Sequence, residues 1–224
     1  MRSLLNLVAL SVTFIIACND PAKKVEIKPT MPPSDFNVII IRHPVVDFGI
    51  WKPKYFEHDS VRMSFGISHY QLARNINDTT EVVIVDRMQD LERARAFSSL
   101  PDLKSLMDNA GVTRPPIVDY VHVIRVDSIE TEIRDRVMVK HKVKDFDAWL
   151  KFFDEKGMDT RRAYGLVDRG LGRNIEDPDI VYIVFAITDK EKAKARLESE
   201  ELRQLQVNAG VEGLPEIVWY KLEQ

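Results

Sequence analysis

The residues best suited to chemistry are two histidines that occupy equivalent positions. His43 and His141 end runs of β-branched residues, in FNVIIIRHPV and DRVMVKHKV. An imidazole titrates near neutral pH, so either could act as a general base or orient an oxygenated substrate. Alternation along a strand places the histidines on the face opposite Arg42 and Lys140. The sequence leaves open which face lines a cavity, and the face with Arg42 and Lys140 would favour an anionic ligand. The sequence also leaves open whether each histidine has only a structural role as a buried core residue.

Further paired positions could bind a ligand. Arg62 and Arg161 could each bind the carboxylate of a ligand through two parallel hydrogen bonds, or form a structural ion pair. His69 aligns with Asp168. Because the two units carry different side chains at this position, their two equivalent pockets should differ in chemistry. We therefore predict catalytic roles for the two histidines. The predicted ligand-binding residues are Arg42, Lys140, Arg62, Arg161, His69 and Asp168.

No sequence pattern indicates a metal site, and we predict no cofactor. Nothing matches a Ser-His-Asp set, a phosphate-binding loop or a dinucleotide-binding glycine run. Among 224 residues there is one cysteine, which excludes an intrachain disulfide and a cysteine-based zinc cluster. The formal net charge of −3 argues against nucleic acid as the main partner.

The candidates occur in pairs because the chain repeats itself. RHPVVDFGIW (42–51) aligns with KHKVKDFDAW (140–149), RNIND (74–78) with RNIED (173–177), and NAGV occurs at 109–112 and 208–211. Three blocks in one order indicate a duplication. The predicted units are 36–125 (unit one) and 136–224 (unit two), joined by a connector over 126–135.

Each unit has the same expected order of elements. In unit two Asp145 is a predicted helix N-cap, and Phe146, Trp149 and Phe153 share one apolar helix face. Gly111 and Gly210 should end the second helix of each unit. The resulting order β-α-β-β-α-β is the ferredoxin-like pattern.

Some local expectations follow from single residues. Pro53 predicts that the first helix begins near Lys52 or is kinked, because proline inside a helix removes a hydrogen bond. Thr188 and Glu191 form a capping-box pattern before the next helix. Trp51 and Trp149 are expected to anchor the core, although a role as a substrate platform stays open.

Fold class follows from how the sheets must be covered. A sheet with helices on one face needs a partner for the other face. Two ferredoxin-like units in one chain can pack sheet to sheet. We therefore predict an α+β fold in which two repeats form one barrel with the helices outside, without need of a second subunit.

The paired motifs resemble the dimeric α/β-barrel superfamily, and within it the antibiotic-biosynthesis monooxygenase-like group. The resemblance rests on H-x-V-x-D-[FY]-x-x-W (141–149), on Arg161 followed by Gly165, and on the closing Leu202–Val211 segment, with matching blocks in unit one. It implies a fused pseudo-dimer of what is usually two subunits. Members include cofactor-free oxygenases, haem-degrading enzymes, peroxidases, isomerases and proteins without known activity, so the resemblance does not select a reaction.

The N-terminus is typical of a targeting segment. Arg2 precedes an apolar run that is too short to span a bilayer, and IIAC (15–18) resembles the lipobox of bacterial lipoproteins. We predict a signal peptide over 1–17, a lipidated Cys18 and a flexible tether over 18–35. The protein would then lie in the cell envelope, anchored to the bilayer, and in a Gram-negative cell on the outer membrane facing the periplasm. An ordinary secretory signal or a plain membrane anchor are the alternatives.

Three functions remain open at this point. The barrel could bind a small apolar or aromatic molecule without chemistry, which is the reading we favour. It could instead be a cofactor-independent monooxygenase or isomerase that uses His43 and His141. A third alternative is a structural or assembly module with filled cavities, which would lack a pocket of about 300 Å³.

Overall fold

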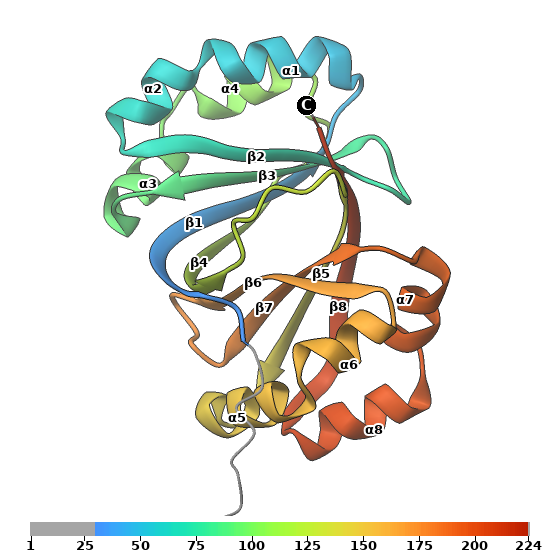
Figure 1. The fold of residues 1–224 in the computed structure, drawn as a ribbon. Helices are drawn as coiled ribbons and strands as arrows, with labels where there is room; N and C mark the ends of the chain where they lie inside the picture. The colour runs from blue at the N-terminus through green and yellow to red at the C-terminus, as the bar shows by residue number, and fades with distance from the viewer. Residues whose placement is uncertain (1–29, 224) are drawn as a thin grey trace, which may run out of the picture.

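The computed structural model describes residues 30–223, so the predicted signal peptide, Cys18 and most of the predicted tether lie outside the described residues. The last residues of the predicted tether are not loose coil, because Met31 is buried in the core of unit two and the first strand begins at Pro33. Within that range the chain forms eight strands and eight helices (Figure 1). Unit one contains β1 (Pro33–Pro44), α1 (Phe48–Glu57), α2 (Asp59–Ser64), β2 (Ile67–Asn75), β3 (Glu81–Met88), α3 (Leu91–Ser98), α4 (Leu103–Asn109) and β4 (Ile117–Val126).

Unit two repeats this order. It contains β5 (Asp135–Val143), α5 (Phe146–Lys156), α6 (Met158–Ala163), β6 (Leu166–Asn174), β7 (Ile180–Ile187), α7 (Lys190–Leu197), α8 (Glu200–Asn208) and β8 (Val211–Leu222). Each predicted helix region consists of two consecutive short helices.

The strands close into one antiparallel barrel in the order β1-β3-β2-β8-β5-β7-β6-β4. The two units join through β4 and β6, where Val121 pairs with Asn174, and through β2 and β8, where Ala73 pairs with Leu222. Figure 1 shows the helices of each unit on the outside of its strands. The predicted α+β fold, with two ferredoxin-like repeats packed as one barrel, is confirmed.

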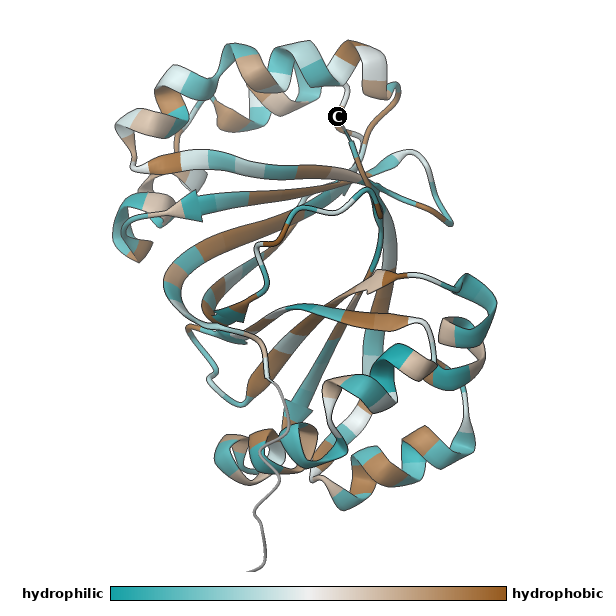
Figure 2. Ribbon diagram, in the orientation of Figure 1, coloured by the Kyte–Doolittle hydropathy of each residue, from teal (hydrophilic) through white to brown (hydrophobic). Residues whose placement is uncertain are grey.

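Alternation along the strands separates two apolar regions. On β1, Val38 and Ile40 point into the barrel, whereas Ile39 and Ile41 point outward to the helices. Figure 2 shows apolar residues concentrated in the strands and polar residues dominating the helices. His43 and His141 therefore lie on the helix side of the sheet, and Arg42 and Lys140 lie on the barrel side.

Aspartate caps position the helices above the sheet. Asp145 accepts a hydrogen bond from the Ala148 amide at 2.9 Å, as predicted. In unit one Asp47 accepts from the Ile50 amide at 2.9 Å, so α1 begins at Phe48 with Pro53 inside it. The expected start near Lys52 is wrong because the N-cap, and not the proline, fixes where the helix begins.

A second cap also differs from the sequence prediction. The N-cap of α7 is Asp189, whose side chain accepts from the Lys192 amide at 3.0 Å, and not Thr188. A carboxylate one residue later outcompetes the hydroxyl. In contrast, Gly111 and Gly210 follow α4 and α8 with φ of 86° and 84°, as predicted for the end of each helix.

Among residues 30–223, no helix has both the length and the hydrophobicity to cross a bilayer.

Candidate functional site

Three cavities lie on the two sides of the barrel wall. One of about 680 Å³ lies inside the barrel and is called the barrel cavity. The other two lie between sheet and helices: the unit-one pocket of about 540 Å³ and the unit-two pocket of about 330 Å³. All three reach the roughly 300 Å³ at which small-molecule pockets begin. The alternative of a module whose cavities are filled by side chains therefore does not describe this chain.

The unit-one pocket combines apolar walls with a few converging polar groups. Its apolar walls come from β1, β2, β3, α1, α3 and α4, among them Ile39, Ile84, Leu103, Leu106 and Met107. Its polar groups include His43 from β1, Tyr55 from α1, Arg62 from α2 and Asp86 from β3. Such a composition suits a mostly apolar molecule with one or two polar substituents.

His43 is a neutral imidazole at the base of this pocket. It is buried, and its ring packs edge-on against Trp51 with centroids 5.6 Å apart. Burial lowers the pKa of His43 to about 4, and its Nδ1 has no hydrogen-bond partner among the described residues. His141 is placed in the same way against Trp149, at 5.5 Å, with its pKa also lowered to about 4 by burial. Both tryptophans are buried core residues, as predicted.

Tyr55, Asp86 and His69 form a hydrogen-bonded chain that unit two lacks. The Tyr55 hydroxyl donates to Asp86 Oδ1 at 2.7 Å, and His69 Nδ1 lies 3.1 Å from the Tyr55 oxygen. Burial and the Asp86 charge raise the pKa of Tyr55, which keeps its proton. Because the one hydroxyl proton points to Asp86, we assign the proton on His69 to Nδ1, as donor to Tyr55.

Arg62 completes the polar side of the pocket. Its guanidinium lies 3.7 Å from the centre of the Tyr55 ring, donates to the Tyr55 carbonyl at 2.7 Å and pairs with Asp59. Its Nε lies 3.8 Å from Asp86 Oδ2, and neither atom has a hydrogen-bond partner among the described residues. The protein alone therefore leaves one donor and one acceptor unsatisfied side by side.

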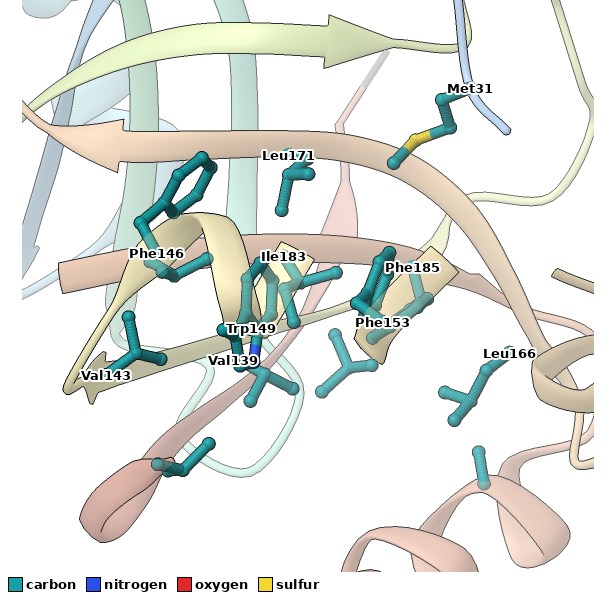
Figure 3. Close-up of a cluster of buried hydrophobic side chains, with 14 of the residues drawn as sticks. Met31, Val139, Val143, Phe146, Trp149, Phe153, Leu166, Leu171, Ile183 and Phe185 are labelled. Atoms are coloured by element: carbon teal, nitrogen blue, oxygen red, sulfur yellow. The ribbon is translucent and has the colours of Figure 1, made fainter. Parts of the chain in front are cut away.

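Unit two closes the equivalent position with a complete ion pair. Arg161 Nε donates to Asp168 Oδ1 at 2.8 Å and to Oδ2 at 3.1 Å, and Asp168 is almost fully buried. Where unit one has Tyr55 and Asp86, unit two has Phe153 and Phe185, which belong to one apolar cluster (Figure 3). Of the two alternatives for Arg161, the structural ion pair fits this geometry.

The predicted site residues thus separate into different environments. His43 and Arg62 line the unit-one pocket, and His69 contacts its wall through Tyr55. His141 and Arg161 line the unit-two pocket, and Asp168 lies behind it, bonded to Arg161. Arg42 and Lys140 lie inside the barrel and are neutralised there: Arg42 pairs with Glu216, and Lys140 Nζ lies 2.7 Å from Asp119. An anionic ligand has little reason to bind these two cations.

Sequence reasoning missed Tyr55 and Asp86. Their signal was present in the aligned repeats, where tyrosine stands against Phe153 and aspartate against Phe185. Because the other copy packs with phenylalanine at each of these positions, packing does not require a polar side chain there. No group of three or more His, Cys, Asp or Glu residues within the described range could hold a metal ion.

Comparison with solved structures supports the fold. The chain superposes on an anthrone oxidase-like protein with a TM-score of 0.55 at 11% identity, covering 85% of this chain and 92% of that one. A proposed monooxygenase from Fusobacterium nucleatum gives 0.53 at 12%, covering 85% and 94%. A heme-binding protein from Thermus thermophilus gives 0.51 at 10%, covering 88% and 95%. At such identities the likeness shows the fold alone. No family model matches the sequence, and no curated protein matches it.

Proposed function

We propose that unit one binds a small, apolar or aromatic molecule that carries a hydroxyl or carbonyl group, in the pocket between its sheet and its helices. The apolar walls would exclude water from the molecule's body. The polar substituent would lie towards His43, Tyr55 and Asp86. Unit two would serve mainly as the other half of the barrel.

The observation that carries this proposal is the contrast between Arg62–Asp86 and Arg161–Asp168. Buried polar atoms in folded proteins nearly always have partners, so an exception points to a group missing from the structure. In unit one a donor and an acceptor form an ion pair 3.8 Å apart, and neither has a hydrogen-bond partner within residues 30–223. One hydroxyl can accept from Arg62 Nε and donate to Asp86 Oδ2 after a small side-chain adjustment. In unit two Arg161 Nε already donates to Asp168, and the unpaired buried polar atoms there are the two ring nitrogens of His141.

A matched pair of variants tests the assignment to unit one. Leu106 lines the unit-one pocket and Leu205 the unit-two pocket, each from the second helix pair of its unit. With 2-naphthol as the probe, we expect saturable binding of one molecule per chain. Leu106→Trp should weaken it about tenfold or more, because the indole fills the pocket, whereas Leu205→Trp should leave it within about twofold.

Three outcomes would contradict the proposal. They are the absence of saturable binding by neutral phenols, an equal loss in both variants, and tight binding of haem with a shifted Soret band in place of phenol binding.

A second candidate function is cofactor-independent oxygenation at the same site, favoured by the Tyr55–Asp86–His69 chain. Loss of a proton from an acidic C–H beside an aromatic ketone gives a carbanion that molecular oxygen can oxidise. For an anthrone, one CH₂ becomes C=O, and one O₂ is consumed as one H₂O is released. Asp86 and neutral His43 are the groups that could take the proton, and Tyr55 could hydrogen-bond to the developing oxyanion.

Oxygen uptake with anthrone separates catalysis from binding. If the protein is an oxygenase, Tyr55→Phe should lower kcat by about 100-fold and change the affinity for the probe by less than about threefold. Binding without oxygen uptake above the uncatalysed rate would rule out this second function and leave the first intact.

We also propose that the protein is a lipoprotein held at a membrane of the cell envelope through Cys18. Its support is the lipobox-like IIAC segment at the end of an apolar run. A diacyl anchor followed by a tether would keep the barrel close to the bilayer. Cys18→Ser should move the protein from the membrane fraction to the soluble fraction, and a variant that stays membrane-bound would contradict the anchor.

A further inference from the structure

The barrel cavity is larger than the two pockets under the helices and is separate from both. The eight strands enclose about 680 Å³, lined mainly by apolar side chains such as Val38, Ile40, Val121 and Met138. The connector between the units also lines it, and in Figure 1 this segment runs as a coil between the two halves. The cavity is of a size that holds small ligands.

Arg136 places an unmatched positive charge in this apolar space. It lies at the start of β5, is 6% exposed and faces the cavity. Its Nη1 donates to the carbonyls of Ile133 and Asp135, at 2.5 and 3.1 Å. No described carboxylate lies within 4 Å of its guanidinium, and Nε and Nη2 bond to no described residue. Val38 holds the equivalent place in unit one, so the fold itself does not require a cation here.

The neighbouring charges do not neutralise Arg136. Arg169 also faces the cavity, but it pairs with Asp127 at 3.0 Å, and its own charge opposes that of Arg136. Arg87 lies over the rings of Phe36 and Tyr70 at the rim. The acidic residues of the connector that line the cavity, Glu130 and Glu132, are exposed to solvent and form no ion pair among the described residues. Tyr220 and Asp135 oppose the effect of burial and raise the pKa of Arg136, but Asp135 pairs with Lys221 and no carboxylate of residues 30–223 forms an ion pair with Arg136. Within the described residues the cavity thus keeps one buried cation without a paired counter-ion.

Burying a charge without a partner costs several kcal/mol, so such a group usually meets its counter-ion in a bound molecule. Burial lowers the pKa of Arg136, but a guanidinium stays protonated in proteins. Arginine also matches a carboxylate with two parallel hydrogen bonds, for which Nε and Nη2 remain available.

We propose that the barrel cavity binds an apolar molecule that ends in a carboxylate, anchored by Arg136. The apolar body occupies the space between Val38, Val121 and Met138, and the carboxylate pairs with the guanidinium. This site differs in ligand charge and in position from the pocket of unit one.

Calorimetric titration with decanoate, and with decanol as its uncharged counterpart, tests the proposal on the whole chain. We expect one decanoate per barrel, bound about tenfold or more tightly than decanol. Arg136→Met should remove this preference and weaken decanoate binding about tenfold or more, the usual effect of losing a charge-assisted hydrogen bond. Arg203→Met, at an exposed arginine of α8, removes the same charge elsewhere and should bind as the wild type does.

A second variant keeps the test decisive if Arg136→Met does not fold. Val184→Phe fills the cavity from β7 without a change of charge and should abolish binding of both probes. Leu106→Trp, which blocks the unit-one pocket, should not affect decanoate. Equal affinities for decanoate and decanol would overturn the proposal, as would unchanged binding in the Arg136 or Val184 variant.

Discussion

At the scale of residues, Arg62 and Arg161 occupy equivalent positions, but the carboxylate that faces each of them comes from a different strand of the repeat. In unit two the acid is Asp168 on β6, and in unit one it is Asp86 on β3, which pairs across the sheet with His69. Moving the carboxylate by one strand frees Asp86 for Tyr55 and leaves its contact to Arg62 at 3.8 Å. The exchange turns a closed ion pair into an open polar site beside an apolar pocket.

The closed ion pair of unit two should behave as a structural element. Asp168→Asn leaves Arg161 buried without a counter-ion, and we expect it to lower the free energy of unfolding by about 3 kcal/mol. Denaturant unfolding measures this loss. The double variant Arg161→Met/Asp168→Leu should recover most of the stability, and a double variant as unstable as the single one would contradict the explanation.

The two buried histidines should make the protein sensitive to acid. The pKa of each is lowered to about 4, against about 6.5 in an unfolded chain. Below pH 6.5 the unfolded chain takes up protons that the native protein does not, so stability falls until about pH 4 and this contribution then levels off. Unfolding free energies at pH 7 and pH 4.5 should differ less in His43→Asn/His141→Asn than in the wild type. An equal difference in both proteins would show that other groups cause the acid sensitivity.

At the scale of elements, the strands where the units meet approach each other closely. A Cβ on Gly172 of β6 would lie 2.6 Å from Val121 Cγ1 and 2.9 Å from the His122 carbonyl oxygen of β4. On the same strand, a Cβ on Gly170 would meet only Val184, at 3.7 Å. Gly172 is therefore required by the junction between units, and Gly170 is not.

Substitution at these two glycines tests the junction. Gly172→Ala should destabilise the protein by about 1–3 kcal/mol because the β4 backbone must shift, as in other overpacked interiors. Gly170→Ala should change the unfolding free energy by less than about 1 kcal/mol. Thermal unfolding of both variants measures the contrast, and equal losses would contradict it.

The elements also show how far the sequence could be interpreted. Strands, helix faces and the N-cap at Asp145 followed from periodicity and repetition, because these are local properties. Pro53 left two alternatives for α1, a start near Lys52 or a kink, and the later start was wrong because Asp47 caps the helix upstream. The N-cap of α7 was assigned to Thr188 because Thr188 and Glu191 have the spacing of a capping box. Asp189, the next residue, is the stronger acceptor and caps the helix.

At the scale of the whole molecule, closure of the barrel decides which side chains meet. Sequence alternation placed His43 and Arg42 on opposite faces, but only the closed barrel shows that the histidine face lies under the helices. The pairing of Lys140 with Asp119 joins β5 to β4, which belong to different units and are not neighbours in the sheet. Contacts of this kind have no signal in one sequence, and for that reason the neutralisation of Arg42 and Lys140 was not foreseen.

Barrel closure also creates two separate binding sites that suit different kinds of ligand. The pocket of unit one presents neutral and hydrogen-bonding groups, whereas the barrel cavity presents an unmatched cation. Duplication makes this division possible, because one copy can keep the fold while the other carries the open polar site.

A crystal structure of the protein with 2-naphthol tests the central claim most directly. The account predicts the naphthol under the helices of unit one, with its hydroxyl within hydrogen-bond distance of Asp86 or Tyr55, and no naphthol in the pocket of unit two. Naphthol bound only in unit two or in the barrel, or with its hydroxyl turned away from these residues, would contradict it.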